Sequence, residues 1–174
     1  MANVRSVALI RFVICVSIVL SLIFLVISTF TNHWYFQQIV ATKNQSVEIN
    51  SGIFQKCYHV KETKSYNCLN TKLNGFIIAV QLFLFFGIVG YSALLIYVLF
   101  SGFFKEINFK VLSVILILTG LSLMIALLIF TGVQSRHGEN IKFQWSFYLG
   151  WLSFIFTVKA GALCCFGTIS YQKI

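Results

Sequence analysis

The sequence contains no proline and no aspartate, and only four of its 174 residues are acidic. None of these acids lies beside a second carboxylate: Glu48, Glu62, Glu106 and Glu139. A Ser/His or Cys/His constellation and a glycine-rich phosphate loop are also missing from the sequence. Enzymes work through such grouped side chains, and nothing here supplies them. We therefore expect no enzyme, with no catalytic residues, no cofactor and no small-molecule substrate.

Charged residues are scarce at 10%, whereas 59% of the residues are hydrophobic. This composition excludes an ordinary soluble domain. A membrane-spanning helix needs about 20 predominantly apolar residues. Four stretches are long enough: 7–30, 76–100, 111–131 and 148–169. The first lacks a small-residue cleavage site, so we expect it to remain as an uncleaved membrane anchor.

These spans predict an all-α membrane protein with one domain, residues 1–174, built as a four-helix bundle. The segments between the spans are two outer loops and one cytoplasmic loop: 31–75 and 132–147 outside, and 101–110 inside. Thirteen basic residues give a net charge of +9, but they are scattered and form no basic stripe. Nucleic-acid binding is therefore excluded. The expected partners are the lipid bilayer and other membrane proteins, including a second copy of the chain.

The first outer loop contains two cysteines, Cys57 and Cys68, with ten residues between them. Their proximity between apolar spans indicates a disulfide in an oxidising compartment. The alternative is a metal site that adds His59, although the spacing matches no common zinc pattern. The loop also contains the sequon Asn44-Gln45-Ser46, which predicts glycosylation of Asn44.

Both features require the outer side of a membrane, so both termini are expected in the cytoplasm. The loop charges indicate the opposite orientation, with five basic residues in the inner segments and seven in the outer loops. We give the disulfide and the sequon the greater weight. Short aromatic and β-branched runs at 35–40, 46–49 and 52–58 predict strands of a small antiparallel sheet. A Cys57–Cys68 bridge between two strands contributes about 3 kcal/mol by restricting the unfolded chain.

Three groups of residues carry a resemblance to a known family. They are Trp34, the segment Gly52-Ile53-Phe54-x-x-Cys57 with Cys68, and the run 143–151 with Trp145, Gly150 and Trp151. With these residues the chain resembles the superfamily of peripheral myelin protein, the epithelial membrane proteins, lens fibre membrane protein and the claudins. It looks nearest to the branch of the lens fibre protein and the natural killer cell granule protein. Where the family usually has Gly-Leu-Trp, this chain has Gly-Ile-Phe, which keeps an apolar, aromatic pair.

The resemblance implies a claudin-like bundle with a small extracellular antiparallel sheet, held on the bundle by Trp34 and Phe54. It also implies a structural or adhesive role at the plasma membrane or cell contacts, through the outer loop and lateral association. The terminal Tyr171-Gln172-Lys173-Ile174 has the form of a sorting signal at Tyr171 and Ile174. The alternative function is therefore a lysosomal or secretory-granule membrane protein, or an auxiliary subunit of another membrane protein.

Two further features lie in the fourth span. Cys164 and Cys165 lie near its cytoplasmic end and are either palmitoylated or packed as small residues. Lys159 stands about ten residues from either end of the span, roughly 15 Å deep. No acid within a predicted span can pair with it. It either snorkels or contacts hydroxyl groups within the bundle, or it pairs with a carboxylate in a partner's span.

Overall fold

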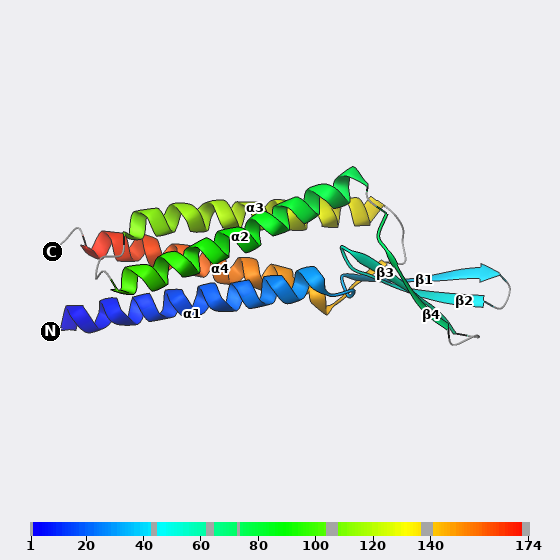
Figure 1. Ribbon diagram of the computed structural model, residues 1–174, viewed down its shortest axis with the longest axis horizontal. Coiled ribbons are helices and arrows are strands. Elements are labelled where there is room, and N and C mark those ends of the chain that lie inside the picture. The colour runs from blue at the N-terminus through cyan, green and yellow to red at the C-terminus, as the bar shows by residue number, and fades with distance from the viewer. Residues whose placement is uncertain are drawn as a thin grey trace.

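A computed structural model describes residues 2–42, 45–61, 65–72, 74–103, 108–136 and 141–171. In chain order the elements are α1 (Ala2–Phe30), β1 (Tyr35–Thr42), β2 (Gln45–Ser51), β3 (Gln55–Val60), β4 (Ser65–Asn70), α2 (Gly75–Phe103), α3 (Phe109–Arg136), β5 (Ile141–Phe143) and α4 (Trp145–Tyr171). The four helices run side by side, and the sheet projects from one end of the bundle (Figure 1). The start of α1 and the end of α4 lie at the opposite end.

Each helix is longer than the span predicted from hydropathy. The chain has no proline, so each helix keeps its backbone hydrogen-bond ladder without the interruption that proline causes. The largest extension is in α3, which runs to Arg136 and includes residues expected in the second outer loop. All four helices are long and apolar enough to cross a membrane. The prediction of a four-helix membrane protein with a small antiparallel sheet is confirmed.

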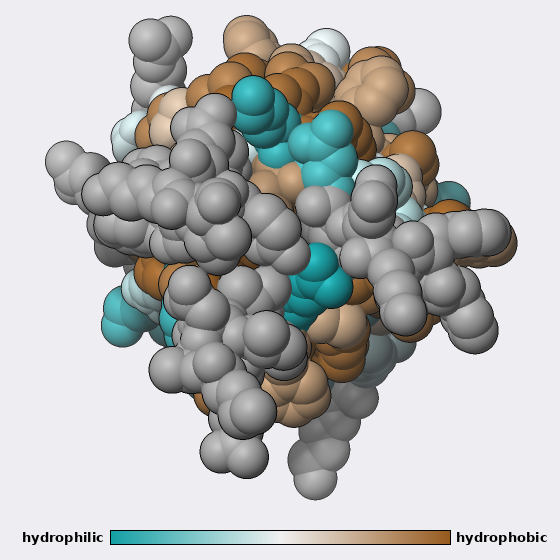
Figure 2. All heavy atoms as spheres, turned by 90° about the vertical axis from the view of Figure 1, so that its left-hand side faces the viewer, coloured by the Kyte–Doolittle hydropathy of each residue, from teal (hydrophilic) through white to brown (hydrophobic). Residues whose placement is uncertain are grey.

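The outside of the bundle is hydrophobic, as a lipid-facing surface requires. Hydrophobic side chains surround the bundle when it is viewed from the end at which α1 begins (Figure 2). Leu9, Phe12, Phe86 and Leu118 are among the exposed ones, and they come from three different helices. Exposing this surface to water would be unfavourable, whereas in a bilayer it contacts the acyl chains.

Helices α1 and α4 pack closely through two layers of serine. Ser21 Oγ donates to the carbonyl of Ser153 at 3.2 Å, and Ser153 Oγ donates to the carbonyl of Ser21 at 2.8 Å. Ser28 and Ser146 repeat this exchange one heptad further out, at 2.7 and 3.0 Å. Small residues let helix backbones approach where lipid supplies no hydrophobic drive for association. This contact fixes the outer ends of both helices, where the sheet begins.

The sheet has five antiparallel strands in the order β4-β3-β2-β1-β5. The prediction of strands was correct for the first outer loop but incomplete. Strand β3 begins at Gln55 rather than at Gly52, because residues 52–54 form the turn that follows β2. A strand at Cys68 was expected without bounds and is β4, whereas β5 was not predicted. The β5 strand comes from the second outer loop and pairs with β1, with Phe36 opposite Lys142.

Gly52 lies in the turn between β2 and β3, against the chain that follows α1. A Cβ atom at this position would lie 2.5 Å from the carbonyl oxygen of Thr31 and 2.8 Å from Cα of Asn32. Because both neighbours are backbone atoms, we expect Gly52→Ala to lower the free energy of unfolding by about 3 kcal/mol. Denaturation of the protein in detergent micelles measures this change.

Gly132 in α3 provides the matched control, because nothing lies within 4 Å of a Cβ built there. Gly132→Ala should leave the stability unchanged or raise it by about 0.5 kcal/mol, since alanine favours a helix. Equal stability of the two variants would show that the close approach at Gly52 is not a constraint.

Candidate functional site

The sheet is held on the bundle by Trp34, which follows α1 and is completely buried. Its Nε1–H donates to the carbonyl of Ser28 at 2.5 Å. Its ring meets Phe130 of α3 edge-on at a centroid distance of 4.6 Å, and Phe147 of α4 at 5.9 Å. The backbone N–H of Trp34 donates to the carbonyl of Ser51 at 3.0 Å. One residue therefore connects three helices with the sheet.

The turn at Ile53 and Phe54 forms a second attachment. Ile53 is buried, and its carbonyl accepts a hydrogen bond from Nε2 of Gln81 in α2 at 3.2 Å. The ring of Phe54 stacks on Phe30 of α1 at 5.8 Å and meets Phe85 of α2 at 6.0 Å. The aromatic residue that replaces the family's usual tryptophan therefore packs against two helices.

The predicted disulfide between Cys57 and Cys68 is confirmed. The two residues lie opposite each other in β3 and β4, and Asn32 Nδ2 donates to Sγ of Cys57 at 3.3 Å. The alternative of a metal site with His59 is wrong, because the two sulfur atoms are bonded to each other. The bridge fixes β4, one of the two edge strands, to β3.

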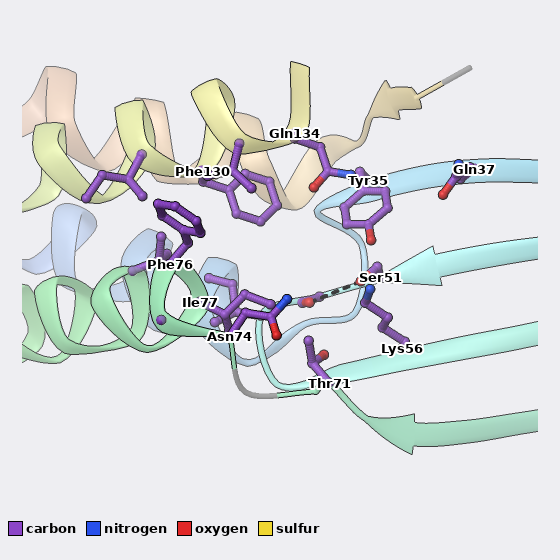
Figure 3. A pocket seen from close by; sticks show the side chains of 16 residues that line it. Tyr35, Gln37, Ser51, Lys56, Thr71, Asn74, Phe76, Ile77, Phe130 and Gln134 are labelled. Atoms are coloured by element: carbon purple, nitrogen blue, oxygen red, sulfur yellow. Dashed lines mark hydrogen bonds between the residues drawn. The ribbon is translucent and has the colours of Figure 1, made fainter. Parts of the chain in front are cut away.

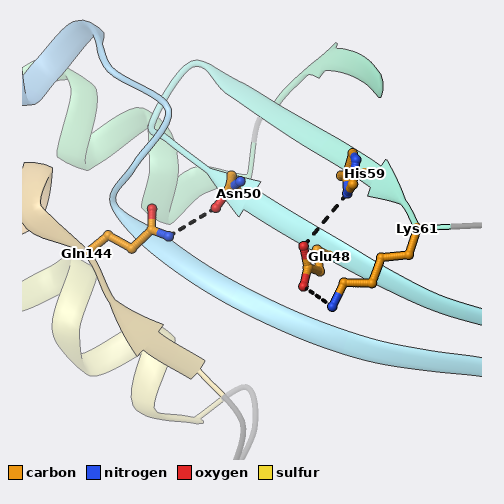
Figure 4. A network of polar contacts seen from close by, with 5 residues as sticks. All are labelled: Glu48, Asn50, His59, Lys61 and Gln144. Carbon is orange, nitrogen blue, oxygen red and sulfur yellow. Dashed lines mark hydrogen bonds and ion pairs between the residues drawn. The ribbon is translucent and has the colours of Figure 1, made fainter. Parts of the chain in front are cut away.

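The face of the sheet that carries the disulfide is polar. Glu48 Oε1 accepts from Nζ of Lys61 at 2.7 Å, and Glu48 Oε2 lies 3.7 Å from Nδ1 of His59 (Figure 4). The hydrogen bond from Lys61 is the main cause that lowers the pKa of Glu48 from its ordinary value. On the same face, Gln144 Nε2 donates to Oδ1 of Asn50 at 3.0 Å and joins β2 to the segment before α4.

Strand β4 forms an edge of the sheet, and five of its six residues are exposed. Tyr66 is 58% exposed and Leu69 is 62% exposed. An edge strand presents unpaired backbone N–H and C=O groups to a partner. The β4 edge, residues 65–70, is thus an exposed edge of the described sheet.

The structure places Lys159 on the outside of α4. The residue is exposed, and its Nζ lies 5.9 Å from the ring centroid of Phe156. The idea that it contacts hydroxyl groups inside the bundle is therefore wrong. It stands fourteen residues after Trp145, the first residue of α4, or about 21 Å along the helix. This places it nearer the end of α4 that lies away from the sheet, and a lysine near a helix end can snorkel to the membrane surface. A carboxylate partner for it remains a prediction.

The predicted modification and sorting residues lie apart from this site. Cys164 is buried and Cys165 is exposed, so palmitoylation remains a prediction for Cys165, and Cys164 packs in the core. Tyr171 is the last residue of α4, whereas Asn44 and Ile174 lie outside the described residues. Glycosylation and sorting therefore remain predictions.

Three residues at the attachment of the sheet to the bundle were not predicted from the sequence. Phe130, Ser28 and Ser146 all contact or support Trp34, yet none has a motif of its own. A signal for the serines existed, because Ser21 and Ser28 are seven residues apart and so are Ser146 and Ser153. Such heptad spacing of small residues predicts a packing face in a membrane helix.

Four apolar helices and a disulfide-linked outer sheet define a multi-pass tetraspan membrane protein. Residues 5–164 match the model of the PMP-22/EMP/MP20/Claudin family, and the chain belongs to this family. It is similar to Claudin domain-containing protein 2 of Homo sapiens, with 33% identity over 139 residues that cover 80% of this chain and 75% of that protein. Placement in the lens fibre and granule protein branch remains a prediction.

Proposed function

We propose that the chain is a non-enzymatic structural and adhesive protein of the plasma membrane, which acts by pairing its outer sheet with a second copy. Membership of the claudin family makes this role plausible. The observation that carries the proposal is the exposed β4 edge. The disulfide holds this strand on β3, so its backbone groups are presented in one fixed conformation.

A second copy is a suitable partner for this edge. Antiparallel pairing of β4 with its own copy obeys twofold symmetry and continues the hydrogen-bond ladder of both sheets. Exposed Tyr66 and Leu69 would then be covered on opposite faces of the joined sheet, because the side chains of residues 66 and 69 alternate. Pairing thus buries apolar side chains that a monomer leaves in water.

The disulfide also supports the proposed orientation. Disulfides form and persist in oxidising compartments, so the sheet belongs on the extracellular side. The start of α1 and the end of α4, which lie at the end of the bundle away from the sheet, are then in the cytoplasm (Figure 1). This orientation agrees with the sequon at Asn44 and opposes the charge count of the loops.

Leu69→Lys tests the proposal, because a lysine on an edge strand disfavours pairing with another chain. We expect about a tenfold loss of self-association, measured by energy transfer between labelled copies at the cell surface. Aggregation of suspended cells that express the chain should fall in parallel.

Gln38→Lys is the matched control, because it adds the same charge at an exposed residue of β1, which is separated from β4 by strands β2 and β3. This variant should associate like the unaltered protein. Equal association of both variants, or a chain found in acidic granules and not at the surface, would contradict the proposal.

A further inference from the structure

A cavity of about 750 Å³ lies between the sheet and the outer ends of α2 and α3. Its volume is within the range of small-molecule sites. The two sides differ in chemistry (Figure 3). The side toward the helices is mainly apolar, with Gln134 of α3 beside Phe76, Ile77 and Val80 from α2 and Ile129, Phe130 and Val133 from α3. The side toward the strands is polar and includes Tyr35 and Lys56.

The beginning of α2 lines this cavity. The first bond of the helix runs from the N–H of Ile78 to the carbonyl of Asn74 at 3.1 Å. The N–H groups of Gly75, Phe76 and Ile77 therefore have no acceptor within the helix. Free N–H groups and the helix dipole together favour an anion at this position.

A buried hydroxyl group in the cavity lining supports the same conclusion. Thr71 is 7% exposed, and its Oγ1 has no hydrogen-bond partner among the described residues. Its position is fixed, because its backbone N–H donates to the carbonyl of Phe54 at 2.8 Å. Burying a hydroxyl without a partner is unfavourable, and a ligand oxygen would supply the missing hydrogen bond.

Lys56 gives the cavity a positive charge. Its Nζ lies 5.9 Å from the ring centroid of Tyr35, and no carboxylate is among the residues that line the cavity. Glu48, the one acid among the described residues, lies on the opposite face of the sheet and is paired with Lys61. Nothing in the cavity lining therefore neutralises Lys56 or would bind a positively charged ligand group.

We propose that this cavity binds the phosphate-bearing headgroup of an anionic phospholipid from the outer leaflet. The phosphate lies at the start of α2, between Lys56 and Thr71, and the acyl chain begins along the apolar side. The location fits a lipid, because α2 enters the membrane here and Phe76 at its start is exposed. This site does not depend on pairing of the β4 edge.

The test uses the purified full chain in detergent micelles, with phosphatidylglycerol or phosphatidylcholine of identical acyl chains. Native mass spectrometry measures the lipid retained. We expect about a tenfold preference for phosphatidylglycerol, because both lipids carry a phosphate but the trimethylammonium group of phosphatidylcholine meets Lys56 and no carboxylate in the lining. Lys56→Gln should remove most of this preference. Thr71→Val should weaken the retention of both lipids, because its hydroxyl faces the phosphate that they share, and Thr71→Ser, which keeps the hydroxyl, should retain them like the unaltered chain.

Lys142→Gln is the matched control, because Lys142 is an exposed lysine of β5 outside the cavity. It should bind phosphatidylglycerol like the unaltered chain. Equal retention of the two lipids by the unaltered chain, or equal losses in Lys56→Gln and Lys142→Gln, would overturn the proposal. So would binding of glycerol phosphate as tight as that of the lipid, because the site would then take free phosphate.

Discussion

Replacing Trp34 with alanine is expected to lower the free energy of unfolding by about 4 kcal/mol. The side chain is completely buried, and its loss would leave a cavity between Phe130 and Phe147. It would also remove the hydrogen bond to the carbonyl of Ser28. Because the sheet is joined to three helices here, we also expect the sheet to become sensitive to protease while the helices remain protected.

One further variant separates the hydrogen bond of Trp34 from the packing of its ring, and a second variant is a control at another tryptophan. Trp34→Phe keeps a ring beside Phe130 and loses the N–H donor, so a cost of about 1–2 kcal/mol is expected. Trp145→Ala removes another tryptophan that is 50% exposed and should cost less than about 1 kcal/mol. Thermal denaturation in micelles and limited proteolysis provide the measurements. A Trp34→Ala protein as stable as Trp145→Ala would contradict the role of this residue in joining the sheet to the bundle.

The second large effect is expected when both Cys57 and Cys68 are replaced by serine. Restraint of this short loop contributes about 3 kcal/mol, because the bridge restricts the unfolded chain. The double variant should lose this stability and should also lose self-association, since β4 is then held on β3 by backbone bonds alone. Unfolding and energy transfer should be measured on the same samples.

Cys165→Ser is the control for the cysteine variant, because Cys165 is exposed and lies at the far end of α4. It should change stability by less than about 0.5 kcal/mol. If the double variant keeps both full stability and full self-association, the disulfide does not prepare the β4 edge for pairing.

The helices could be predicted from sequence because a membrane demands long apolar stretches, which leave a clear signal. The ends of the helices could not. The polar residues that extend α3 to Arg136 resemble a loop in composition, but the helix continues through them. It was also not predictable from the sequence that Lys159 lies on the side of α4 that faces away from the bundle. A span that is apolar all round does not reveal which side faces the bundle.

The disulfide and the principal strands could be predicted, because cysteine spacing and turn residues are local signals. Strand β5 could not, since three residues carry no pattern of their own and form a strand only by pairing with β1. The cavity at Lys56 and Thr71 was also beyond sequence analysis. These residues are separated by β4 in the chain, and only the fold brings them together with the start of α2.

The most direct test of the central claim is photo-crosslinking in intact cells, with a photoreactive amino acid in place of Asn67 on the exposed β4 edge. The proposal of sheet pairing predicts a crosslinked dimer of the chain in the surface-labelled fraction. The same amino acid in place of Gln38 on β1 should give little dimer. A monomer alone from position 67, or equal yields from both positions, would contradict pairing through the β4 edge.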